Sequence, residues 1–194
     1  MPALLLALGS YLFGALFDIA AIRDVPRAKP FLAAGLAIAH LAGIYRLASH
    51  SRRFPAPRPL QRLCTVLAPL GMAGMGYSIF VEVPLRKGWL ERGHVDELVT
   101  DGTYSLTRHP GVLWYAGWVL CAAVATRSRR LLAAAPLLVA GDVAHVAFQE
   151  RFVLLPRFGE AYRAYQRTTP MLIPDGRSLR RFVRALLCRD TAPT

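Results

Sequence analysis

The sequence predicts an all-α fold, an integral membrane bundle of about five transmembrane helices with a cytosolic C-terminal segment. Apolar residues make up 54% of the chain and the mean hydropathy is +0.33, both above the usual values for a soluble domain of this size. The apolar residues also gather into five stretches of roughly membrane-spanning length. Short polar connections and the absence of repeats or low-complexity tracts suit one compact domain.

The five apolar stretches are predicted to be membrane helices in order along the chain. The first has no Lys or Arg before Arg23 and is interrupted by Asp18, so it lacks the basic start of a signal peptide. The fourth is at the lower length limit for a span. The predicted helices are residues 2–22, 30–48, 61–82, 111–126 and 131–149.

The distribution of Lys and Arg indicates an orientation, although two topologies compete. With five spans and the N-terminus outside, the inner side would hold 16 of the 24 basic residues, including Arg86, Lys87 and Arg92. The outer side would hold the other 8, which is unusually basic for an outer face. We favour a C-terminus inside and expect a multi-pass protein of a bacterial inner (cell) membrane with its site facing the cytoplasm.

The net charge of +12 is spread between apolar helices instead of forming one soluble basic face, which argues against a nucleic-acid partner. Anionic membrane lipids are the expected partner. In the tail, residues 176–194, an apolar helical stripe lies opposite four arginines, which predicts a helix on the membrane surface. Docking on the protein's own cytosolic face is the alternative. The stripe is Leu179, Phe182, Val183, Leu186 and Leu187, and the arginines are Arg177, Arg180, Arg181 and Arg184.

A polar group precedes the fourth predicted helix. Pro110 suits a first helical turn, because its missing N–H would have no partner there. Arg108 and His109 then flank a helix start, where free N–H groups favour a carboxylate or phosphate. Three aromatic residues follow that could stack on an adenine or attract a cation: Trp114, Tyr115 and Trp118. The alternative is an interfacial aromatic belt with a snorkelling arginine.

The fifth predicted helix carries one polar face near its inner end. Asp142, His145 and Gln149 recur at helical spacing, with Glu150 somewhat further round. Ionisable groups at membrane depth normally face a cavity or the bundle interior, so either a cavity or a satisfied polar network would explain this face. His145 with Asp142 could act as a base, or His145 could be a hydrogen-bonded interior histidine.

Two motifs together resemble the isoprenylcysteine carboxyl methyltransferase and phospholipid methyltransferase superfamily of membrane enzymes. The first is "LVTDGTYSLTRHP", in which Leu98, Val99, Gly102, Tyr104, Arg108, His109 and Pro110 match. The second is "ERFVLLPRFGEAYRAY" followed by "TPMLIP", in which Glu150, Leu154, Phe158, Gly159, Tyr162, Tyr165, Pro170 and Pro174 match. The resemblance covers about residues 95–175, and the three cysteines show no metal-type or paired spacing.

The resemblance implies S-adenosylmethionine as cofactor, bound between the last two membrane helices and the segment that follows them. Residues 1–82 would then be N-terminal membrane helices of a single domain, and residues 95–175 its cofactor-binding and catalytic region. Glu150 would meet the positive part of the cofactor or the substrate, and Tyr162, Arg163 and Tyr165 would close the pocket. The other implied cofactor residues are Leu98, Val99, Gly102, Tyr104, Arg108, His109, Pro110 and Tyr115. Glu150 and His145 are the candidate catalytic residues.

Four positions depart from the family pattern: Val112, Val146, Arg151 and Met171. The prenylcysteine enzymes have an arginine where this chain has Val146, which argues against a prenylcysteine carboxylate as acceptor. Another carboxylate, a thiol, an amine or a lipid head group on a lipophilic acceptor remains open. Two other classes also remain open, a related membrane reductase that uses NADPH and a non-catalytic membrane scaffold derived from the family.

Overall fold

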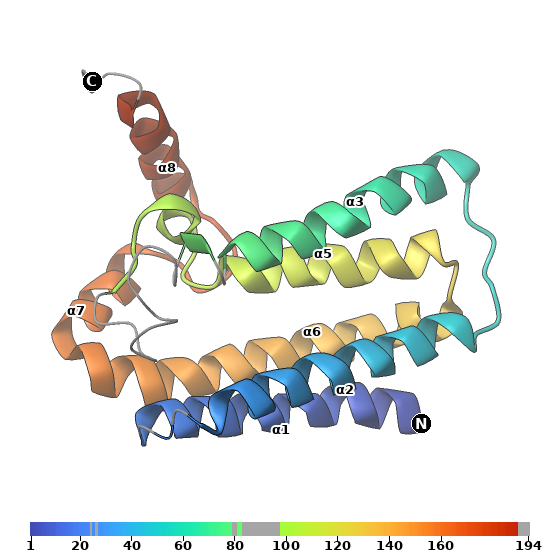
Figure 1. Cartoon of the computed structure of the whole chain (residues 1–194). Helices are drawn as coiled ribbons and strands as arrows, with labels where there is room; N and C mark the ends of the chain where they lie inside the picture. The colour runs from blue at the N-terminus through green and yellow to red at the C-terminus, as the bar shows by residue number, and fades with distance from the viewer. Residues whose placement is uncertain (24, 26, 79–80, 83–97, 190–194) are drawn as a thin grey trace.

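Long helices run back and forth along one direction in the computed structural model of the chain (Figure 1). The structure describes residues 1–23, 25, 27–78, 81–82 and 98–189, and all the elements within them are helical. The all-α prediction is therefore confirmed for these residues. The long helices are α1 (Pro2–Ile22), α2 (Lys29–Ser49), α3 (Arg58–Tyr77), α5 (Pro110–Ala125) and α6 (Arg129–Gln149). The shorter elements are η2 (Gly102–Ser105), the π-helical turn η3 (Glu150–Leu154), α7 (Leu155–Thr168) and α8 (Gly176–Arg189).

The starts of the long helices follow from local chemistry. Four of them, α1, α2, α3 and α5, have a proline in the first turn, where no N–H partner is lost. The fifth, α6, is capped instead by Ser128, whose hydroxyl accepts the Leu131 N–H at 3.0 Å. α3 begins and ends earlier than the predicted stretch 61–82. Residues 79–80 of that stretch, and the basic residues 86, 87 and 92 of the charge count, lie outside the described residues.

Three helical segments among the described residues are long and apolar enough to cross a membrane: α1, α2 and the continuous segment Arg129–Thr168. α5 is apolar but has only 16 residues, or about 24 Å of helix, against roughly 30 Å of hydrocarbon. α3 begins with Arg58, Gln61 and Arg62 within its first two turns, which lowers its hydropathy. Large apolar side chains point outward, with Leu12, Phe31 and Ile38 each at least 69% exposed. Such a surface suits lipid.

The core lies where the long helices meet. α1 packs against α2 and α6, α3 packs against α5, and α5 also contacts α6. Ala7, Val119, Leu131 and Leu138 are completely buried in this core. At Gly43 an added Cβ would lie 2.8 Å from the Ala7 backbone nitrogen, so the glycine permits a close approach of α1 and α2.

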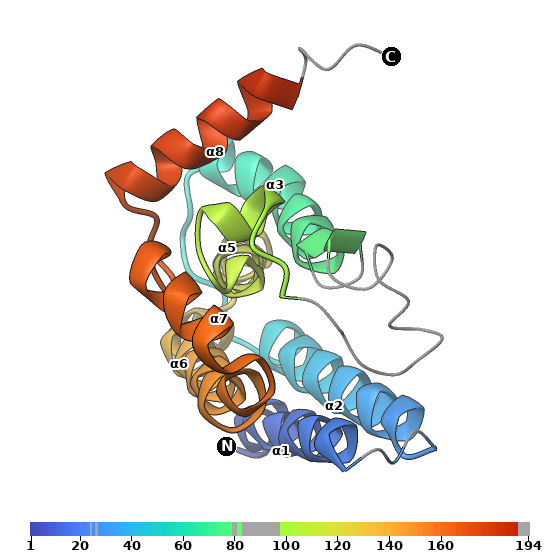
Figure 2. The ribbon, with the colours of Figure 1, turned by 90° about the vertical axis from the view of Figure 1, so that its left-hand side faces the viewer.

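The two ends of the bundle hold different parts of the chain. The distal end, defined as Met1 with the connections 50–57 and 126–128, lies opposite η2, α7 and α8 (Figure 1). Backbone hydrogen bonds join its two connections, from Phe54 N–H to the Arg127 carbonyl at 2.9 Å and from Arg129 N–H to the Arg52 carbonyl at 3.2 Å. The opposite end, seen face-on in Figure 2, holds both of the sequence motifs.

Candidate functional site

The two motifs meet through their backbones, although they are far apart in the chain. The Arg108 N–H donates to the Pro170 carbonyl at 2.9 Å, and the His109 N–H donates to the Met171 carbonyl at 3.2 Å. The Thr107 hydroxyl donates to the same Met171 carbonyl at 2.6 Å. The segment before α5 and the segment after α7 therefore run side by side.

The side chains of the same motifs converge on the Glu150 carboxylate. Oε1 accepts from Arg108 Nε at 2.7 Å and lies 2.9 Å from His109 Nε2. Oε2 accepts from an Arg108 terminal nitrogen at 3.2 Å and from Gln166 Nε2 at 2.8 Å. The Arg108, His109 and Glu150 side chains are each only 9–10% exposed. The four hydrogen bonds that this buried carboxylate accepts offset the free-energy cost of its burial and fix its position.

The Glu150 carboxylate lies beside the start of α5, where it contacts the Arg108 and His109 side chains. His109 is the N-cap residue of α5 and Pro110 lies in its first turn, as predicted from the sequence. An ionised carboxylate can only accept, so His109 donates through Nε2–H, which fixes the proton on that ring nitrogen. A seat for an anion was predicted here without an occupant. The structure pairs the two flanking side chains with Glu150, and the seat for a ligand's carboxylate or phosphate stays a prediction.

A π-helical turn sets Glu150 at the end of α6. The Leu155 N–H donates to the Glu150 carbonyl five residues earlier, instead of to a carbonyl four residues earlier. The next residue, Pro156, has no N–H with which to continue an α-helical pattern through this turn. Turns of this kind are frequent at functional sites, and no sequence pattern predicted this one.

Two arginines cap the last carbonyls of α7, which have no partner within the helix. Arg108 donates to the Thr169 carbonyl at 2.7 Å and to the Gln166 carbonyl at 3.4 Å. Arg181 of α8 donates to the Thr168 carbonyl and, at 3.3 Å, to the Thr169 hydroxyl. The end of α7 therefore links α8 to the cluster around Glu150.

Tyrosine hydroxyls tie η2 to its surroundings. The Tyr165 hydroxyl donates to the Tyr104 carbonyl at 2.6 Å, and the Tyr104 hydroxyl donates to the Ser78 carbonyl at 3.3 Å. Burial and, secondly, the charge of Glu82 raise the pKa of the Tyr104 hydroxyl, so Tyr104 stays a neutral donor. These bonds hold the chain before Arg108 in place.

Glu82 also holds η2 in place through hydrogen bonds from Thr103. Its carboxylate accepts the Thr103 N–H at 3.0 Å and also the Thr103 hydroxyl. Gly102 precedes this contact with φ +60°, and a Cβ there would run into Glu82 Oε1. Only glycine suits both the backbone conformation and the space. The backbone conformation and the contact with Glu82 therefore explain why the predicted site residue at position 102 is a glycine.

Two buried hydroxyls of this region, those of Ser78 and Tyr162, have no hydrogen bond to a described residue. Tyr162 is 1% exposed, and its hydroxyl is buried without a hydrogen bond to any described residue. Its ring packs edge-on against Tyr165 at 6.0 Å, and its hydroxyl is close enough to feel the charge of Glu150. A buried hydroxyl without a partner costs free energy, so a ligand atom at this point would stabilise the site.

The polar face of α6 lies against α1. Asp18 accepts from Gln149 Nε2 at 3.1 and 3.2 Å, and its carboxylate lies 3.5 Å from His145 Nε2. For His145 and Gln149 this is the predicted polar network, with Asp18 as the partner. The sequence indicated Asp18 only as a polar anchor near a helix end and not as a partner of His145 and Gln149, although an acidic residue inside an apolar stretch is a signal for a buried partner.

Other predicted site residues lie apart from Glu150. Tyr115 is in the core, where its hydroxyl lies 2.9 Å from His40 Nε2. Arg163 is 62% exposed and pairs with Glu160, so it does not share the buried cluster. Leu98 is partly buried and Val99 is buried, just before η2.

Comparisons of the chain with protein-family models, with curated proteins and with solved structures find no match. The family resemblance therefore remains a prediction from the two motifs, and the contacts described above are the basis for a functional proposal.

Proposed function

We propose that this chain is an integral membrane methyltransferase that transfers a methyl group from S-adenosylmethionine to a lipophilic or lipid-borne acceptor. The observation that supports the proposal is the convergence of Arg108 and His109 on Glu150. These three residues come from the two motifs on which the resemblance depends, and they share one buried cluster.

The residues around Glu150 would hold a nucleoside cofactor with a charged amino-acid part. The unsatisfied Tyr162 hydroxyl would donate to an oxygen or nitrogen of that molecule, and the backbone from Gly102 to Tyr104 would border it. Glu150 would hold Arg108 and His109 in place, and its charge would favour a nearby sulfonium. When bound, the cofactor supplies an activated methyl group, and the acceptor displaces the thioether in line.

His145 is the proposed base for an acceptor that must lose a proton, such as a thiol or an ammonium group. Asp18 faces Nε2 of His145 and favours the tautomer with the proton on that nitrogen. Nδ1 then keeps its lone pair and can take the proton of the acceptor. Asp18 replaces Asp142 as the proposed partner of His145 and acts as a positioning residue.

The proposed topology has five spans, with the site end in the cytoplasm. The five long helices alternate in direction, so the N-terminus and the site would lie on opposite sides of the bilayer. α8 points away from the bundle, across the direction of the long helices (Figure 1), and leaves Leu179, Val183 and Leu187 exposed. These side chains at i, i+4 and i+8, with arginines around them, would insert α8 into an anionic membrane surface.

Calorimetric titration of S-adenosylmethionine into the detergent-purified protein tests the proposal, with NADPH as comparator. We expect saturable binding of S-adenosylmethionine that is lost in Glu150→Gln, which removes the charge that holds Arg108 and His109. Glu160→Gln is the matched control, since Glu160 is exposed on α7 and pairs only with the exposed Arg163. Binding of NADPH alone would favour the reductase, and binding of neither cofactor would favour the scaffold.

A further inference from the structure

The distal end of the bundle is strongly basic and has no acidic residue of its own. Residues 42–62 contain five arginines and residues 120–136 contain three, and neither segment contains Asp or Glu. Residues 1–17 at the same end carry no charged side chain. Within these three segments the eight arginines therefore have no acidic side chain to balance them.

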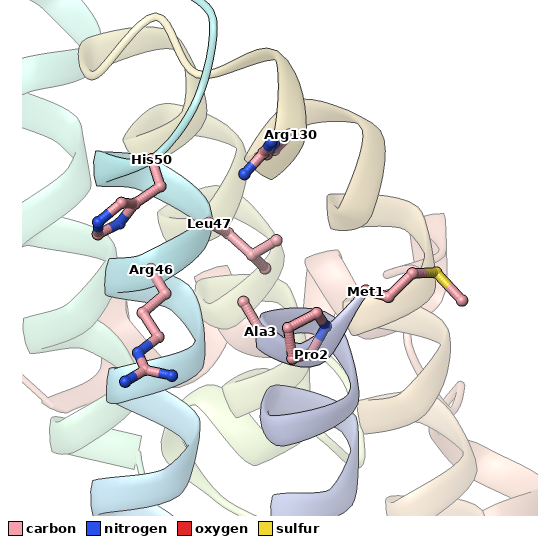
Figure 3. A pocket seen from close by; sticks show the side chains of 7 residues that line it. All are labelled: Met1, Pro2, Ala3, Arg46, Leu47, His50 and Arg130. Atoms are coloured by element: carbon pink, nitrogen blue, oxygen red, sulfur yellow. The ribbon is translucent and has the colours of Figure 1, made fainter.

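A pocket of about 300 Å³ opens at this end, between the ends of α1, α2 and α6 (Figure 3). Leu47, which is 7% exposed, lies at its centre with Ala3 and Pro2 beside it. Basic side chains surround this apolar part: Arg46 and His50 from α2, and Arg130 from α6. The pocket thus combines an apolar floor with a cationic rim.

The two guanidinium groups of the rim are uncompensated. Neither the Arg46 nor the Arg130 guanidinium forms a hydrogen bond or an ion pair with any residue that the structure describes. Both side chains are exposed, so an anion could reach them without a change of fold. Arginine is well suited to phosphate, because its planar fork can donate two parallel hydrogen bonds.

We propose that this pocket binds the phosphate head group of an anionic phospholipid. All three helices that form the pocket belong to segments apolar enough to cross a membrane, so the pocket lies where head groups and acyl chains meet. The phosphodiester accepts from Arg46 and Arg130, and the glycerol end of the acyl chains lies on Leu47, Ala3 and Pro2. This site is at the opposite end from Glu150, and the inference does not depend on the proposed methyl transfer.

The test is the thermal unfolding midpoint of the full chain in a zwitterionic detergent, titrated with phosphatidylglycerol. We expect a saturable rise of the midpoint, and no comparable rise with phosphatidylcholine. In the double variant Arg46→Gln/Arg130→Gln, the half-saturating concentration of phosphatidylglycerol should increase by about tenfold or more. Arg58→Gln/Arg62→Gln is the matched control, because it removes the same charge from exposed positions of the same end but outside the pocket.

Three results would overturn the proposal. An equal loss in both double variants would mean that diffuse charge attracts the lipid, and the absence of any lipid effect would mean that there is no site. An equal rise with inorganic phosphate alone would indicate a site for free phosphate. If the glutamine variant fails to fold, Arg46→Lys/Arg130→Lys keeps the charge without the fork and should still weaken the lipid response several-fold.

Discussion

Arg108 and Glu150, 42 positions apart, form a two-pronged ion pair in which Nε meets Oε1 at 2.7 Å and a terminal nitrogen meets Oε2 at 3.2 Å. Removal of either partner leaves a charge buried without compensation. Arg108→Ala should therefore lower the free energy of unfolding by about 3–5 kcal/mol. Arg163→Ala, which breaks an exposed pair, should cost only about 0–1 kcal/mol. Thermal unfolding in detergent measures the loss of stability in both variants. Equal losses would contradict a larger contribution from the buried pair of Arg108 than from the exposed pair of Arg163.

Gly102→Ala should destabilise the site end. At φ +60° an alanine is strained by about 1–2 kcal/mol, and its Cβ also displaces the Glu82 carboxylate from Thr103. Gly117→Ala in α5 is the control, because its Cβ would meet nothing within 4 Å and alanine favours a helix by up to about 1 kcal/mol. The unfolding midpoint should fall in the first variant and stay level or rise in the second. A rise in both would show that Gly102 needs no special conformation.

Gly14→Ala should disturb His145. A Cβ at position 14 would lie 2.9 Å from the His145 ring, which must move and thereby loosen its contact with Asp18. Gly9→Ala on the same helix meets nothing within 4 Å and should not destabilise the protein. The double variant Gly14→Ala/His145→Ala should recover part of the stability lost by Gly14→Ala, because the obstructing ring is gone. Strict additivity of the two single variants in thermal unfolding would argue against this contact.

Cysteine accessibility tests the proposed topology. In a variant without its native cysteines, Glu160→Cys at the site end and Arg53→Cys at the distal end both present exposed positions. A membrane-impermeant thiol reagent should label position 160 only from the cytoplasmic side and position 53 only from the opposite side. Labelling of both positions from one side would exclude a bundle that crosses the membrane between them.

Most of the helices follow from local features of the sequence. Apolar length and a proline in the first turn depend on neighbouring residues alone, so the predicted starts at 2, 30, 111 and 131 agree with α1, α2, α5 and α6 to within two residues. Local patterns also indicated which segments form the candidate site. These patterns are Arg108-His109-Pro110 and the run after Glu150. The third predicted helix, 61–82, was placed less well, because α3 begins at the charged residue Arg58, outside the apolar stretch.

The partners of the polar groups, in contrast, depend on how the helices pack in three dimensions. Asp18 and Gln149 are 131 positions apart, and no periodicity within one helix can show that α1 and α6 bring them into contact. The same holds for Glu150 as the partner of Arg108 and His109, and for the pocket at Leu47 that three helices form together. Helix formation depends on hydrogen bonds and burial within about 20 residues, whereas these pairings depend on how the helices pack.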